Sequence, residues 1–177
     1  MPDVLEQFLS GMAAACVKFN EAIEKRCAIE CIVLGAAIVD GQLRMALILR
    51  EQLQSNFQAI QEKLLCQADD ERGTSERSIF RRCRDTGIVN EPLFQRLGAA
   101  YDKRNKIIHR YLLSDANYAF ATALVLEYAD LIEAVKQVVH RIESEQIRLG
   151  RGMTVPGPEC DLSWIREMAE DKEQRKS

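Results

Sequence analysis

The segment Arg104-Asn105-Lys106-Ile107-Ile108-His109-Arg110-Tyr111 gathers residue types that can do chemistry. An arginine guanidinium is always charged and binds phosphate as a planar fork. A histidine imidazole, whose free pKa is about 6.5, takes up or gives a proton at cellular pH. Attack of an RNA 2′-hydroxyl on its own phosphodiester needs these two services and no metal ion. The segment is therefore a candidate site for metal-independent RNA cleavage.

Helical geometry sets where these side chains point. On an ideal helix Arg104 and Tyr111 share one face, and Asn105 and His109 share another about 100° away. Arg104 and His109 diverge by about 140°, so they flank a groove rather than stack on each other. Two copies of the helix across a twofold axis would place two Arg–His pairs in one cleft. The spacing therefore predicts a homodimer.

The neighbouring residues suit an anionic substrate. Lys103, Lys106 and Arg110 add positive charge, and Tyr111 can donate a hydrogen bond or stack on a base. A plainer interpretation stays open, because basic residues at a helix end also gain from the helix dipole without any ligand.

Charge is distributed unevenly along the chain. The whole sequence carries a net charge of −3, which argues against a generic nucleic-acid binder. Residues 77–111 nevertheless contain nine Lys/Arg and three Asp/Glu, a local +6, which leaves −9 for the remainder. Such asymmetry can direct a polyanion to one face. The alternative is a solvated basic helix face that binds nothing.

Composition indicates one helical domain. The 177 residues suffice for a sizeable core, and only nine glycines and four prolines are available for turns. Asp3 and Glu6 interrupt any secretory signal, and the longest apolar run, 31–39, is far shorter than the roughly 20 residues of a membrane helix. We expect a cytoplasmic protein with no membrane partner.

The six cysteines show no paired spacing. Cys27 and Cys31 are four apart and could share a metal on a helix, but neither histidine lies nearby in sequence. We therefore expect buried free thiols in a reducing compartment, and neither a metal nor a cofactor.

Apolar periodicity predicts an all-α bundle of four to five main helices over residues 1–149. The expected helices are 3–24, 25–54, a short one that carries Phe57, Ile60 and Leu64, 74–84, 91–113 and 114–148. Thr74 or Ser75 is expected to cap the fourth helix, Gly87 to end it and Asn90 to cap the fifth. Gly35 would allow a neighbouring helix to approach closely. Whether the first two helices are continuous stays open.

Residues 150–177 are predicted to form a linker and a short docking helix. Gly150, Gly152, Pro156 and Pro158 mark the linker, and Trp164 would anchor the helix that begins near residue 162.

Arg104-Asn105-x3-His109 resembles the motif of the HEPN superfamily of helical-bundle proteins. With Tyr111 it becomes Arg-x4-His-x-Tyr, the form found in HEPN toxins that pair with minimal nucleotidyltransferase antitoxins. The resemblance covers about residues 25–145.

The resemblance implies a metal-independent endoribonuclease whose two protomers share one cleft. Arg104 would stabilise the phosphate, His109 would act as general acid or base, and Asn105 would orient either of them. Tyr111 matches the position that such antitoxins modify. The chain would then serve as a toxin, a phage-defence protein or a stress-response effector. Its tail after Gly150 departs from the compact toxins.

Two other classes of protein fit the same sequence. One is a non-catalytic HEPN-like regulator or assembly protein, similar to the mannitol-repressor type. The other is a helical interaction protein that binds through residues 151–177. Among the remaining polar residues, His140 is expected to be structural, while Glu30 and Asp40 could support the basic motif, cap a polar seam or face a dimer interface.

Overall fold

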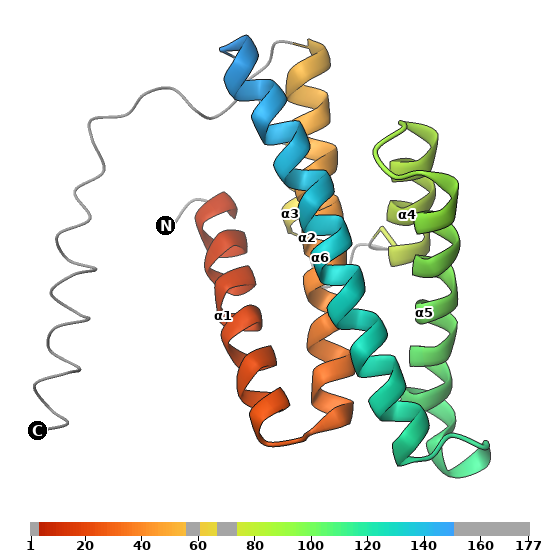
Figure 1. The fold of residues 1–177 in the computed structure, drawn as a ribbon. Coiled ribbons are helices and arrows are strands. Elements are labelled where there is room, and N and C mark those ends of the chain that lie inside the picture. Colours follow the sequence, from red (N-terminus) through yellow and green to blue (C-terminus); the bar gives the residue numbers. More distant parts are fainter. Residues whose placement is uncertain (1–3, 56–60, 67–73, 151–177) are drawn as a thin grey trace, which may run out of the picture.

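The computed structural model describes residues 4–55, 61–66 and 74–150, and these are helical with no strand among them (Figure 1). The all-α fold class is therefore confirmed. The predicted linker and docking helix lie outside the described residues. The helices are α1 (Val4–Glu24), α2 (Ala28–Ser55), α3 (Glu62–Leu65), α4 (Glu76–Asp85), α5 (Glu91–Arg110), the 3-10 helix η1 (Tyr111–Leu113) and α6 (Tyr118–Leu149).

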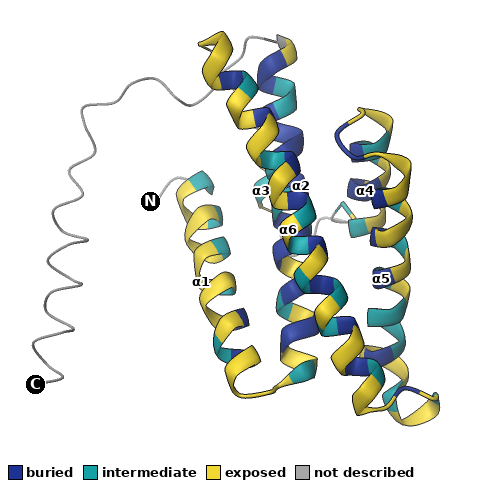
Figure 2. Ribbon diagram, viewed as in Figure 1, coloured by how far each residue is buried: buried dark blue, intermediate teal, exposed yellow. Residues whose placement is uncertain are grey.

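α2 and α6 lie side by side at the centre, with α1 on one side and α4 and α5 on the other (Figure 1). α2 contributes many of the most deeply buried side chains, among them Ile32, Leu43 and Leu47, whereas α1 is exposed over most of its surface (Figure 2). By length and hydropathy α2 could cross a membrane, but 61% of its most apolar stretch is buried inside the bundle. A core helix has the same properties.

α2 and α6 approach closely where Gly35 faces Tyr128. A Cβ added to Gly35 would lie 3.0 Å from Tyr128 Cβ and 3.3 Å from Phe19 Cε2. The Tyr128 hydroxyl donates a hydrogen bond to the Ala100 carbonyl of α5 at 3.4 Å, so this side chain links α6 to two neighbours. The expected close approach at Gly35 is confirmed.

A break at Arg26 separates the first two helices. Its φ of 58° lies in the left-handed region, and Cys27 N donates to Ala22 O at 2.9 Å across the turn. α1 and α2 are therefore two helices joined by a tight turn, which answers the question that the sequence left open.

The predicted signals around α4 and α5 are confirmed. The Ser75 hydroxyl caps α4, and Asn90 Oδ1 accepts from Leu93 N at 3.0 Å to cap α5. Gly87, at φ 68°, ends α4 in a Schellman motif in which Ile88 N donates to Cys83 O at 2.8 Å. The connection between the two helices is thus closed by local hydrogen bonds.

Two predicted boundaries are wrong. α5 ends at Arg110 rather than near residue 113, because Arg110 leaves helical geometry at φ −139° and ψ 22°. α6 begins at Tyr118 rather than at Ser114. Asn117 Oδ1 accepts from Phe120 N at 2.9 Å and caps the helix, while Ser114 Oγ accepts from Ala116 N in the preceding turn.

The prediction that the cysteines are buried is only partly right. Cys31 and Cys83 are buried, and burial raises the pKa of the Cys83 thiol to about 12. Cys16, Cys27 and Cys66 are exposed, because they fall on outward faces or in a turn. Cys160 lies outside the described residues. Within the described ranges, no three His, Cys, Asp or Glu side chains gather as a metal site would need.

The contact between Gly35 and Tyr128 predicts opposite effects for two glycine replacements. Gly35→Ala should lower the free energy of unfolding by about 1–2 kcal/mol, because overpacking against Tyr128 outweighs the gain in helix propensity. Gly98→Ala in α5 meets nothing within 4 Å and should raise it by about 0.5–1 kcal/mol. Urea unfolding of both variants measures this, and a stabilised Gly35→Ala would contradict the tight contact.

Candidate functional site

The three predicted catalytic residues share one surface hollow. It has a volume of about 240 Å³ and lies where the second half of α5 meets α2 and the first turn of α4. We call it the motif hollow; it is lined by Val33, Ala37, Glu76, Arg104, Asn105, Ile108 and His109. Arg104 and His109 thus line one hollow within a single chain, whereas the helical spacing pointed to a cleft shared by two copies.

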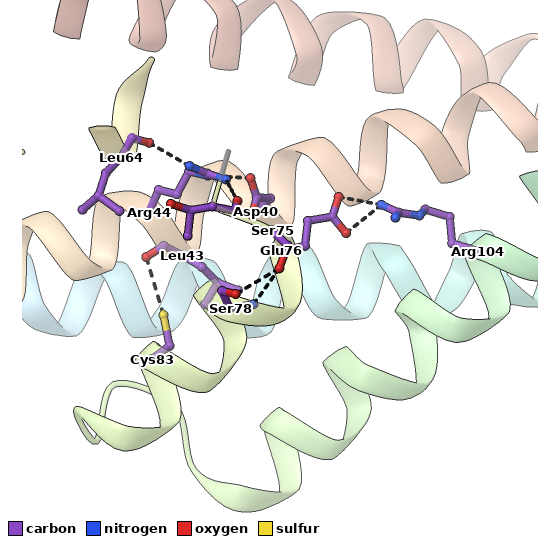
Figure 3. A network of polar contacts seen from close by, with 10 residues as sticks. Asp40, Leu43, Arg44, Leu64, Ser75, Glu76, Ser78, Cys83 and Arg104 are labelled. Carbon is purple, nitrogen blue, oxygen red and sulfur yellow. Dashed lines mark hydrogen bonds and ion pairs between the residues drawn. The ribbon is translucent and has the colours of Figure 1, made fainter. Parts of the chain in front are cut away.

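Arg104 is held by an ion pair with Glu76 (Figure 3). Its Nη1 donates to Glu76 Oε1 at 2.6 Å and to Oε2 at 2.7 Å, and its Nη2 donates to Asn105 Oδ1 at 3.1 Å. The side chains of Arg104 and Glu76 are only 16% and 25% exposed. The guanidinium is therefore fixed in place, and its charge is already balanced by a carboxylate.

An aromatic ring supports the same guanidinium. Arg104 lies over the ring of Tyr101 at 4.7 Å, and Arg77 lies over that ring at 4.9 Å. The Tyr101 ring also packs against Phe80 in a T-shaped contact, with the ring centroids 6.3 Å apart. Such cation–π contacts add orientation and modest stabilisation. Tyr101 precedes Arg104 by three positions, and this spacing alone places the two side chains on one face of the helix.

His109 is exposed and belongs to two hollows. The second has a volume of about 530 Å³, and we call it the end hollow; it is lined by Asp102, Asn105, Lys106, His109, Arg110, Leu113 and Ser114. Asn105 and His109 line both hollows, so they form the boundary between them. The imidazole is open to solvent and to any substrate that crosses this boundary.

The predicted substrate-binding residues are only partly brought together. Lys106 and Arg110 line the end hollow, where Lys106 pairs with Asp115 and its hydrogen bond lowers the pKa of that carboxyl. Lys103 instead pairs with Glu127 of α6 at 2.7 Å, and Tyr111 is half-buried against the core. Neither Lys103 nor Tyr111 lines the motif hollow or the end hollow.

Most of the charge in segment 77–111 is balanced by carboxylates. Six of its nine cations take part in ion pairs, which join Arg77 to Asp102, Arg82 to Glu51, Arg84 to Asp85, Lys103 to Glu127, Arg104 to Glu76 and Lys106 to Asp115. Within the described chain, Arg81, Arg96 and Arg110 form no ion pair. Asp85 and Asp102 are already counted in the local charge of +6, and the other four carboxylates come from outside the segment and lower that charge to +2.

Asp40 does not line the motif hollow. It pairs with Arg44 at 2.6 Å, and Arg44 also donates to the Leu64 and Thr74 carbonyls (Figure 3). Burial raises the pKa of Asp40, while Arg44 and, at longer range, the charge of Arg104 oppose that rise. Glu30 is exposed in the first turn of α2, and His140 is exposed on α6 beside Glu143.

The contact of Arg104 with Glu76 is the feature that sequence reasoning missed. Ser75-Glu76 marked only a helix start, and nothing local relates Glu76 to a residue 28 positions later.

No family model matches the chain, and neither a curated protein nor a solved structure is significantly similar to it.

The ion pair predicts a specific cost for losing Glu76. Glu76→Gln should lower the free energy of unfolding by about 1–3 kcal/mol, because Arg104 would keep a largely buried charge without its carboxylate. Glu133→Gln is the matched control: its pair with Lys136 is exposed, and we expect a change within about 0.5 kcal/mol. Denaturant unfolding compares the two, and equal effects would mean that the Arg104 pair has no special role in stability.

Proposed function

We propose that the chain is a HEPN-like, metal-independent endoribonuclease of the cytoplasm that acts as a homodimer. The observation that carries the proposal is the motif hollow, where Arg104, Asn105 and His109 line one surface. Its biological role would be that of a toxin, a phage-defence protein or a stress-response effector.

In this mechanism Arg104 binds the scissile phosphate. Glu76 and Tyr101 hold the guanidinium in place before substrate arrives, so little side-chain entropy remains to be lost on binding. The nitrogens Nε and Nη2 face Asn105, a neutral acceptor. Phosphate oxygens would replace Asn105 there, because a charged acceptor makes the stronger hydrogen bond with a guanidinium.

His109 would carry the proton transfer. The RNA 2′-hydroxyl loses its proton and attacks phosphorus, the bond to the 5′-oxygen breaks, and that oxygen takes up a proton. The products are a 2′,3′-cyclic phosphate and a 5′-hydroxyl. One imidazole serves as base and a second as acid. Because each chain supplies one His109, a second copy would provide the partner group.

The surface around the motif hollow supports dimerisation. Ile29 and Val33 of α2 are 50% and 45% exposed, and Ile108 of α5 is 43% exposed beside Val33. Apolar side chains of this size gain free energy when they leave water. A second copy packed over them would enclose the hollow and its two flanking residues.

A non-catalytic regulatory or assembly protein is the competing function. The Glu76 carboxylate favours it, because it balances the one guanidinium that would bind phosphate. In that case Arg104 would serve structure alone, and the exposed apolar surface would dock a partner protein.

Cleavage of RNA in EDTA tests the proposed enzyme. His109→Ala should reduce the rate by about 100-fold or more, since general acid–base catalysis contributes at least that much. Arg104→Ala should cause a loss of similar size. The matched control is His140→Ala, which removes the other histidine of the chain, exposed on α6.

The fold of each variant is checked by circular dichroism. Cleavage that survives unchanged in both His109→Ala and Arg104→Ala would refute the site. An intact RNA in the presence of folded, dimeric wild-type protein would favour the regulatory alternative.

Dimerisation through the motif hollow is tested by introducing charge on its rim. Val33→Asp and Ile108→Asp should each raise the dimer dissociation constant by about tenfold or more, because the carboxylate would be buried unpaired. Leu126→Asp on α6 is the control, as Leu126 is 66% exposed and outside the hollow. Light scattering across a concentration series measures the mass, and a dimer weakened only by Leu126→Asp would place the interface elsewhere.

A further inference from the structure

A third hollow, far along α5 from His109, collects three arginines. It has a volume of about 680 Å³ and lies between α2, α6 and the connection from α4 to α5. We call it the arginine hollow. Arg50 of α2, Arg96 of α5 and Arg141 of α6 line it, and Ile88, Leu93 and Val138 supply an apolar part of its wall.

The charges in the arginine hollow are poorly balanced, unlike those at the motif hollow. No carboxylate is among its lining residues in the described chain. Neither Arg96 nor Arg141 forms an ion pair within that part of the chain, and both are exposed. Arg50 reaches Glu145 only at 4.0 Å, the outer limit of an ion pair. The protein thus brings three like charges together without the counterions that it uses elsewhere.

Arg50 also has a donor without an acceptor. Its Nε is buried, and no acceptor for it lies in the described residues. A buried guanidinium N–H left without a partner costs free energy, and an anion in the hollow would remove that cost. The capped start of α5 at Asn90 also lies against the hollow, where the helix dipole adds partial positive charge.

We propose that the arginine hollow binds a phosphate group through Arg50, Arg96 and Arg141. Three planar forks around one space match the several oxygens and the negative charge of a phosphate. The volume exceeds that of phosphate alone and leaves room for the group that carries it, either a small phosphorylated molecule or an RNA backbone. The site shares no lining residue with the motif hollow, so it does not depend on the proposed ribonuclease activity.

Calorimetric titration with inorganic pyrophosphate tests the site. The wild-type chain should bind saturably, and the double variant Arg96→Gln with Arg141→Gln should bind at least about tenfold more weakly, since each lost charged hydrogen bond removes that order of affinity. The two side chains are exposed, so the variant should fold. Arg81→Gln, an exposed and unpaired arginine of α4 outside the hollow, is the control and should leave binding unchanged.

A second arm identifies the source of the phosphate. A short single-stranded RNA is titrated into His109→Ala protein with and without the double substitution. A matching loss of RNA affinity assigns the site to the RNA backbone, and an RNA affinity that stays constant while pyrophosphate binding falls assigns it to a small phosphorylated molecule. Absence of pyrophosphate binding to the wild-type chain, or equal binding by the double variant, would overturn the proposal. If the wild-type chain binds pyrophosphate but does not cleave RNA, the result counts against the proposed ribonuclease activity and leaves the phosphate site standing.

Discussion

α2 carries apolar side chains on almost every side, and the need to remove them from water constrains the whole bundle. α6 covers one side of it, at a distance set by Gly35 and Tyr128. At the far end, the buried Gln146 side chain donates to Leu49 O and Gln52 Oε1, which fixes the register of the two helices. α4 and α5 then occupy the side that remains. The candidate site lies where α5 and α4 meet an exposed stripe of α2.

Pairing of charges decides what the basic segment can do. An arginine that binds phosphate must be held in place and still be available, and these needs conflict at Arg104. Glu76 and Tyr101 meet the first need and oppose the second. The arginine hollow has the opposite balance, since its cations are less firmly held and less neutralised. Net charge along the sequence does not distinguish the two situations, whereas the position of the carboxylates does.

Sequence reasoning succeeded where the signal is local. Apolar spacing predicted the helices, and the capping pair Thr74 or Ser75, together with Gly87 and Asn90, predicted the ends of α4 and the start of α5. It failed at the start of α6, because Ser114 and Asn117 are both good capping residues and their types alone do not say which of them begins the helix. It also failed for Glu76 and for the arginine hollow, since both are made by residues from distant parts of the chain that only the tertiary fold brings together.

The capped connection between α4 and α5 fixes the position of one helix relative to the other. Glu76 is the first residue of α4, and Arg104 lies in the second half of α5. Hydrogen bonds at Gly87 and Asn90 hold the connection between the two helices. One inserted residue in either helix would turn one partner by about 100° and move it by about 1.5 Å, which is enough to separate carboxylate from guanidinium. The number of residues from Glu76 to Arg104 is therefore as much a part of the site as the identity of either side chain. Substitutions on the outer faces of the two helices leave that length unchanged, whereas an insertion or deletion within them does not.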